Sequence, residues 1–103
     1  MSDEHAKAHF SAETRLAPHF VIMANSDALK RGALAIWTIY NRPKDYPDGF
    51  IARLHEAAKG KTGPTDKTIV GGLDELRHVF YRAGLSRIHR SPGDEPPIVE
   101  CWL

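Results

Sequence analysis

The sequence predicts an α+β domain in which one principal helix packs on one face of a small, mainly antiparallel sheet. Two strand-like runs support this prediction. Residues 34–40 are almost wholly aliphatic, aromatic or β-branched, and residues 50–55 alternate between two faces. A third run, residues 72–83, has apolar residues at helical spacing. With 103 residues, the chain is long enough for one hydrophobic core.

The two strand-like runs differ in which of their faces carry large side chains. In residues 34–40, Trp37 faces one side and Thr38 the other, and large side chains follow on both faces, which is typical of a central strand. In residues 50–55, the more polar face carries Arg53 and His55. The turn-rich segment between the two runs predicts a long, proline-restricted loop.

The helix has both its start and its end marked in the sequence. Acidic residues come early, Arg82 comes late, and Gly84 follows where a C-cap is expected. The apolar positions are Leu73, Leu76, Val79, Phe80 and Ala83. Turns and mobile loops are expected over residues 57–67, then a short strand at 67–70, and further strands at 85–89 and 98–103.

The first part of the chain shows no sustained periodicity. We therefore expect residues 1–32 to form a partly disordered N-terminal arm and residues 33–103 to form the compact α+β domain. Within the arm, residues 6–15 favour a weak helix and residues 20–23 a short strand, with Pro18 between them.

Composition excludes some classes of function. The 14 Lys and Arg nearly balance the 13 Asp and Glu, so a net charge of +1 gives no reason to expect a nucleic-acid or membrane partner. The single cysteine, Cys101, fits a reducing compartment, and we expect a cytoplasmic protein. The acidic first residues and the short apolar run at 20–23 do not fit a signal peptide or a membrane span.

Several short stretches look familiar: Ile-Trp-Thr-Ile-Tyr at 36–40, Asp-Tyr-Pro at 45–47, Ala-Arg at 52–53, and Arg-Ser-Pro at 90–92 with the ending Pro-Ile-Val-Glu-Cys-Trp-Leu at 97–103. Over about residues 35–103 the chain resembles a family of small uncharacterised proteins from bacterial and prophage-related genomes. This resemblance implies a compact α+β domain. It implies no activity, and no catalytic residue is carried over from it.

The candidate binding residues lie in the loop and on the following strand. Arg42 and Tyr46 belong to a rigid loop that could serve as a contact or simply close the core. Arg53 and His55 could bind an anionic ligand on the polar sheet face. The alternative for Arg53, which we favour, is a partly buried ion pair with Glu100 across the sheet.

The sequence supports no catalytic or metal site, and no cofactor is expected. His5 and His9 have the spacing of two ligands on one helix, but they lack further ligands on a stable scaffold. Cys101 could meet His55, His78 or His89 as a nucleophile with its base, yet a cysteine in an apolar strand is more often a small buried side chain.

These observations favour a non-enzymatic interaction module that binds an unknown protein partner or self-associates through an edge strand, for which the last strand is the first candidate. An alternative is a small enzyme that uses Arg53, His55 and a carboxylate. A further alternative is an accessory nucleic-acid binder with a basic strip around Arg77 and Arg87.

Overall fold

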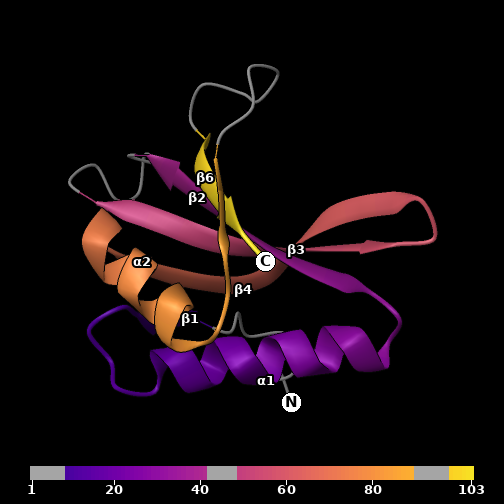
Figure 1. Cartoon of the computed structure of the whole chain (residues 1–103), viewed down its shortest axis with the longest axis horizontal. Helices are drawn as coiled ribbons and strands as arrows, with labels where there is room; N and C mark the ends of the chain where they lie inside the picture. The colour runs from indigo at the N-terminus through magenta and orange to yellow at the C-terminus, as the bar shows by residue number, and fades with distance from the viewer. Residues whose placement is uncertain (1–8, 42–48, 90–97) are drawn as a thin grey trace, which may run out of the picture.

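The protein has an α+β fold. The computed structural model describes residues 9–41, 49–89 and 98–103, and within them a six-stranded sheet is accompanied by two helices (Figure 1). In chain order the elements are β1 His9–Ser11, α1 Ala17–Lys30, β2 Leu34–Asn41, β3 Phe50–Ala58, β4 Lys61–Gly71, α2 Leu73–Arg82, β5 Arg87–His89 and β6 Ile98–Trp102. Neither described helix is long and apolar enough to cross a membrane.

The sheet is mixed but mainly antiparallel, with the strand order β1-β4-β3-β2-β6-β5. β1 pairs with β4 in parallel, and the other neighbouring strands run antiparallel. β2 therefore lies inside the sheet, as its two bulky faces predicted. The last strand, β6, was the expected edge, and that expectation is wrong: β6 lies between β2 and β5. The edges of the described sheet are the three-residue strands β1 and β5.

Both helices pack on the same face of the sheet, where the core lies. Trp37 and Ile39 from β2 and Ala52 and Leu54 from β3 are fully buried there. These residues follow the alternation expected from the sequence, because side chains two apart on a strand point to the same side. Phe80 of α2 packs between the two indoles, with ring centroids 5.4 Å from Trp37 and 5.7 Å from Trp102. Both tryptophans belong to the hydrophobic core.

The predicted helix over residues 72–83 is confirmed as α2. The expectations for the N-terminal arm were wrong within the described part. Residues 9–15 contain β1 and turns in place of the weak helix, and residues 17–30 form α1 in place of a short strand. Pro18 does not interrupt α1 because it lies in the first turn, where a proline removes no intrahelical hydrogen bond.

α1 belongs to the same core as the sheet, so a domain boundary at residue 32 does not separate it from the rest. Its buried face consists of Ala17, Val21, Ala24 and Ala28. Ala17, Val21 and Ala24 join the cluster that holds Trp37. Small alanine side chains let the helix approach the sheet closely, and they carry no strong hydrophobic signal in the sequence.

The segment at 57–67, expected to be loops, is largely strand. β3 and β4 form a hairpin whose turn contains Lys59 and Gly60, both with positive φ. In Figure 1 the tip of this hairpin extends away from the helices. The register shifts between Arg53 and His55, so β4 can accommodate Pro64 opposite His55. The turn-forming residues at 57–67 are tolerated because β3 supplies the pairing.

Candidate functional site

The two described helices leave the other face of the sheet uncovered, and one row of side chains crosses that face from edge to edge. Each member of the row lies directly opposite the next in the strand register. In strand order the row is His9, Thr68, Arg53, Thr38, Cys101 and Ile88. Residues paired in this way point to the same side of a sheet, so strand order gathers side chains that are far apart in the chain.

We define the helix-free face by this row and the register-matched residues on either side of it. A second row, two residues further along the strands, consists of Ser11, Val70, Ile51, Tyr40 and Ile98. The other residues of the face lie toward the tip of the β3–β4 hairpin. The register-paired residues of the face are His9, Ser11, Leu34, Ile36, Thr38, Tyr40, Ile51, Arg53, His55, Ala57, Thr62, Pro64, Thr68, Val70, Ile88, Ile98 and Cys101. The face is dominated by isoleucine, valine, threonine and one tyrosine.

Tyr40 and His55 close over the centre of the face. The Tyr40 hydroxyl and His55 Nε2 share a 2.9 Å hydrogen bond, and their ring centroids are 6.3 Å apart. Tyr40 lies opposite Ile51, whereas His55 lies four residues further along β3, so both side chains lean toward each other over the intervening pair. That pair is Thr38 with Arg53, which explains why Thr38 is only 6% exposed.

Hydrogen bonds fix the other polar side chains of the row. Arg53 donates from Nη1 to the Thr65 backbone carbonyl at 2.7 Å. His9 Nδ1 and Thr68 Oγ1 are 2.7 Å apart. No buried side-chain nitrogen or oxygen among the described residues is left without a partner. The buried polar side-chain atoms of the helix-free face are therefore satisfied within the fold.

The charge state of His55 follows from its position. Burial, together with the positive charge of Arg53, lowers the pKa of His55 from its usual value of 6.5. The imidazole is therefore neutral near pH 7, with one nitrogen as donor and the other as acceptor. A neutral ring next to a guanidinium suits a hydrogen-bonded contact surface, because the two groups do not repel each other.

The structure brings together two of the four predicted binding residues. Arg53 and His55 share the helix-free face, as the alternation in β3 predicted. Arg42 and Tyr46 lie outside the described residues. Sequence reasoning missed Tyr40 as the partner of His55, although its position on the Thr38 side of β2 placed it on this face.

The expected ion pair between Arg53 and Glu100 is wrong. Glu100 lies opposite Ile39, on the helix-covered face, and is 4% exposed. Its Oε2 and Oε1 accept hydrogen bonds from Arg77 Nε at 3.0 Å and Nη2 at 2.9 Å. The indole Nε1 of Trp102 also donates to Glu100 Oε2 at 3.0 Å. The partner of the buried carboxylate is thus an arginine of α2.

This arrangement changes the interpretation of the basic strip. Burial alone would raise the pKa of Glu100, but the hydrogen bonds from Arg77 and Trp102 and the nearby positive charges lower it below 4.5. Arg87 adds an ion pair with Glu100 at 3.9 Å. Arg77 and Arg87, which the sequence suggested as phosphate contacts, therefore both pair with the buried carboxylate of Glu100.

The described residues give little support to a cysteine nucleophile or to a metal site. The Cys101 sulfur lies 3.7 Å from the Thr38 hydroxyl, while the His55 ring is bonded to Tyr40. His9 bonds Thr68. In the part of the chain that the structure describes, no cluster of three or more His, Cys, Asp or Glu could hold a metal ion.

The chain matches no family model, and no curated protein or solved structure matches it. The resemblance of residues 35–103 to small bacterial proteins stays a prediction.

Proposed function

We propose that the protein is a small non-enzymatic interaction module that self-associates through the helix-free face. The composition of that face carries the proposal. Arg53 is the one charged side chain among the register-paired residues of this face, none of which is Lys, Asp or Glu, while Asp66 lies within the register shift of β4. Depletion of Lys, Asp and Glu beside Tyr, Arg and large aliphatic residues distinguishes the core of a protein interface from an ordinary solvated surface.

A second copy of the same face is a suitable occupant. Two sheets can pack face to face about 10 Å apart, and a two-fold arrangement uses the same surface on both partners. In sheet order the six strands are 3, 11, 9, 8, 5 and 3 residues long, and at about 3.3 Å per residue and about 4.8 Å between strands they give a flat area of roughly 600 Å². Side-chain relief adds to this area, which brings it toward the ~800 Å² per partner of a standard interface.

The face is favoured over the edges as the contact. β1 and β5 each offer three residues for pairing, and short edge strands resist strand addition. The exposed start of β4 contains Pro64, which has no N–H to donate.

The two alternative functions find less support. A catalytic Arg53 or His55 would need functional atoms aimed at a substrate, yet Arg53 Nη1 donates to the Thr65 carbonyl and His55 Nε2 is bonded to the Tyr40 hydroxyl. A nucleic-acid binder would need available cations, but Arg77 and Arg87 are both engaged by Glu100.

Sedimentation velocity over a concentration series tests the proposal. The wild-type chain is expected to dimerise, and placing a carboxylate on the face should weaken the dimer at least about tenfold, since each mutation acts twice in a two-fold interface. We choose Ile51→Glu at the centre and Ile88→Glu at the edge. Ile88 is 43% exposed, so its variant tests the face even if Ile51→Glu does not fold.

Leu29→Glu is the matched control. Leu29 is a 75% exposed apolar side chain on α1, away from the helix-free face, and the same charge placed there should leave the dimer unchanged. Far-UV circular dichroism checks that each variant is folded. A wild-type chain that stays monomeric up to about 1 mM would refute self-association. Equal weakening by Leu29→Glu and Ile88→Glu would refute the choice of surface.

A further inference from the structure

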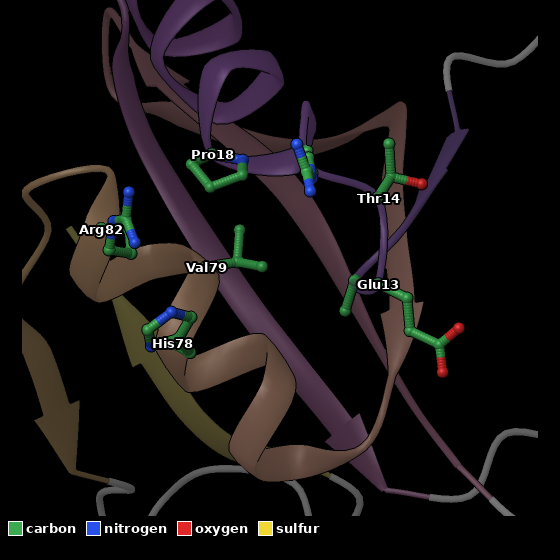
Figure 2. A pocket seen from close by; sticks show the side chains of 8 residues that line it. Glu13, Thr14, Pro18, His78, Val79 and Arg82 are labelled. Carbon is green, nitrogen blue, oxygen red and sulfur yellow. The ribbon is translucent and has the colours of Figure 1, made fainter.

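A pocket opens on the opposite side of the molecule from the helix-free face, between the start of α1 and the outer side of α2. Its volume is about 420 Å³. Figure 2 shows His78, Val79 and Arg82 along one wall, Pro18 near the first turn of α1, and Glu13 and Thr14 along the facing loop. The full lining is Ala12, Glu13, Thr14, Arg15, Pro18, His78, Val79 and Arg82.

The pocket contains the unpartnered arginines of the described chain. Four of the six described arginines have an acceptor or an ion-pair partner: Arg31 with Glu56, Arg53 with Thr65, and both Arg77 and Arg87 with Glu100. The remaining two, Arg15 and Arg82, have no hydrogen bond or ion pair among the described residues, and both line the pocket. Two guanidinium groups without acceptors at one cavity are suited to an anion.

The other lining residues agree with this electrostatic character. Glu13 is the one acidic residue in the lining, and Figure 2 shows its carboxylate directed away from His78 and Arg82. The first turn of α1 contains no acidic residue, so its partial positive charge is not cancelled locally. His78 adds a ring that can donate a hydrogen bond, one helical turn from Arg82 on the same side of α2.

We infer that this pocket binds a small organic molecule that carries a phosphate monoester. Two arginines match a dianion better than the single charge of a carboxylate or a sulfate ester, and a phosphate monoester is close to dianionic above pH 7 because its second pKa is about 6. The cavity is larger than a phosphate group alone requires and falls in the size range of small-molecule sites. Pro18, which is half-buried, offers an apolar contact to the organic part, and the buried Val79 lies in the wall of the pocket. This site is independent of the helix-free face.

Isothermal titration calorimetry at pH 8 and low ionic strength tests the inference with two probes of equal shape. Phenyl phosphate is a dianion there and phenyl sulfate a monoanion, so phenyl phosphate should bind about tenfold more tightly or better. Arg15→Gln and Arg82→Gln should each weaken phenyl phosphate about tenfold, because each removes a charge-assisted bidentate donor. Arg82→Lys should fall between Arg82→Gln and the wild type, since it keeps the charge but not the fork.

Lys30→Gln is the control for charge, since it removes one positive charge at the far end of α1 and should leave binding unchanged. Both arginines and Lys30 are exposed, so these variants should keep the wild-type circular dichroism spectrum. No heat from phenyl phosphate up to about 10 mM would overturn the inference. So would equal affinity for phenyl sulfate or benzoate, or equal weakening by Lys30→Gln. Tighter binding of a phosphoserine peptide than of phenyl phosphate would reassign the site to a phosphorylated protein.

Discussion

The ion pair between Glu100 and Arg77 should be a main polar determinant of stability, and a double-mutant cycle can measure it. The cycle consists of Glu100→Gln, Arg77→Met and the double variant. The Glu100 side chain is 5% exposed and Arg77 is 35% exposed, so one charge is buried and the other is partly screened by water. Removing Arg77 leaves the buried carboxylate with the Trp102 indole and the more distant Arg87.

The expected magnitude follows from this geometry. Breaking a fully buried pair costs about 3–5 kcal/mol, and hydrogen bonds to charged groups contribute about 1.5–3 kcal/mol each. Because Arg77 is partly exposed, we expect Arg77→Met to cost about 2–3 kcal/mol. The double variant should recover part of the summed losses, with a coupling energy of about 1.5–2.5 kcal/mol between the two residues.

Urea denaturation followed by tryptophan fluorescence measures each variant, and a loss of about 2 kcal/mol would lower the melting temperature by roughly 8 °C in a domain of this size. The exposed pair Arg31–Glu56 is the matched control. Its arginine side chain is 52% exposed, so Arg31→Met and Glu56→Gln should couple by about 0.2–1 kcal/mol. A coupling energy at Arg77–Glu100 no larger than that of the control would refute the reasoning.

Three further predictions follow from individual residues. The pKa of His55 should lie below 6.5 in an NMR titration, and stability should fall as pH drops from 6.5 toward that lower value, because the unfolded chain then binds the extra proton; a pKa at or above 6.5 would contradict this. Gly71→Ala should cost about 1–3 kcal/mol in urea denaturation, since an added Cβ would lie 2.5 Å from Ala12 Cβ, whereas Gly63→Ala meets open space and should cost less. Val21→Ala should cost about 1.5–3 kcal/mol by the same measurement, because Val21 is fully buried on the core-facing side of α1; an unchanged midpoint would mean that α1 is only loosely attached to the sheet.

The free energy of unfolding at acid pH should also depend on Glu100. Its pKa is lowered in the folded state, so the stability it contributes is present above about pH 4.5 and is lost as pH falls through the folded value. The His55 effect occupies a higher range, below pH 6.5, so the two losses can be separated in a pH series.

Local patterns along the chain determine much of the fold. The alternation in β2 and β3 placed Trp37 in the core and put Arg53 and His55 on the same face, because strand period is a property of the backbone itself. α2 followed from its apolar spacing and its early acidic residues. These features require neighbours along the chain only.

α1 was missed because its local signals are ambiguous. Four consecutive apolar residues at 20–23 look like a strand, and Pro18 looks like a breaker. Only the packed structure gives Pro18 a first-turn position and turns Ala24 and Ala28 into a contact face for the core. Burial against partners distant in sequence overrides weak local preference, which is why the arm expected from sequence is part of the fold.

Tertiary structure alone decided which polar groups meet. The partner of Glu100 depends on the register of β6 against β2, with its shift between Ile39 and Tyr40, and on the placement of α2 over that face. A register change of one residue would move Glu100 to the other side of the sheet. The alternation of residues along β6 therefore could not show whether Glu100 faces Arg53 or Arg77. The pocket arginines, Arg15 and Arg82, meet for the same kind of reason: they lie on elements whose packing is set by the whole core and by no pattern along the chain.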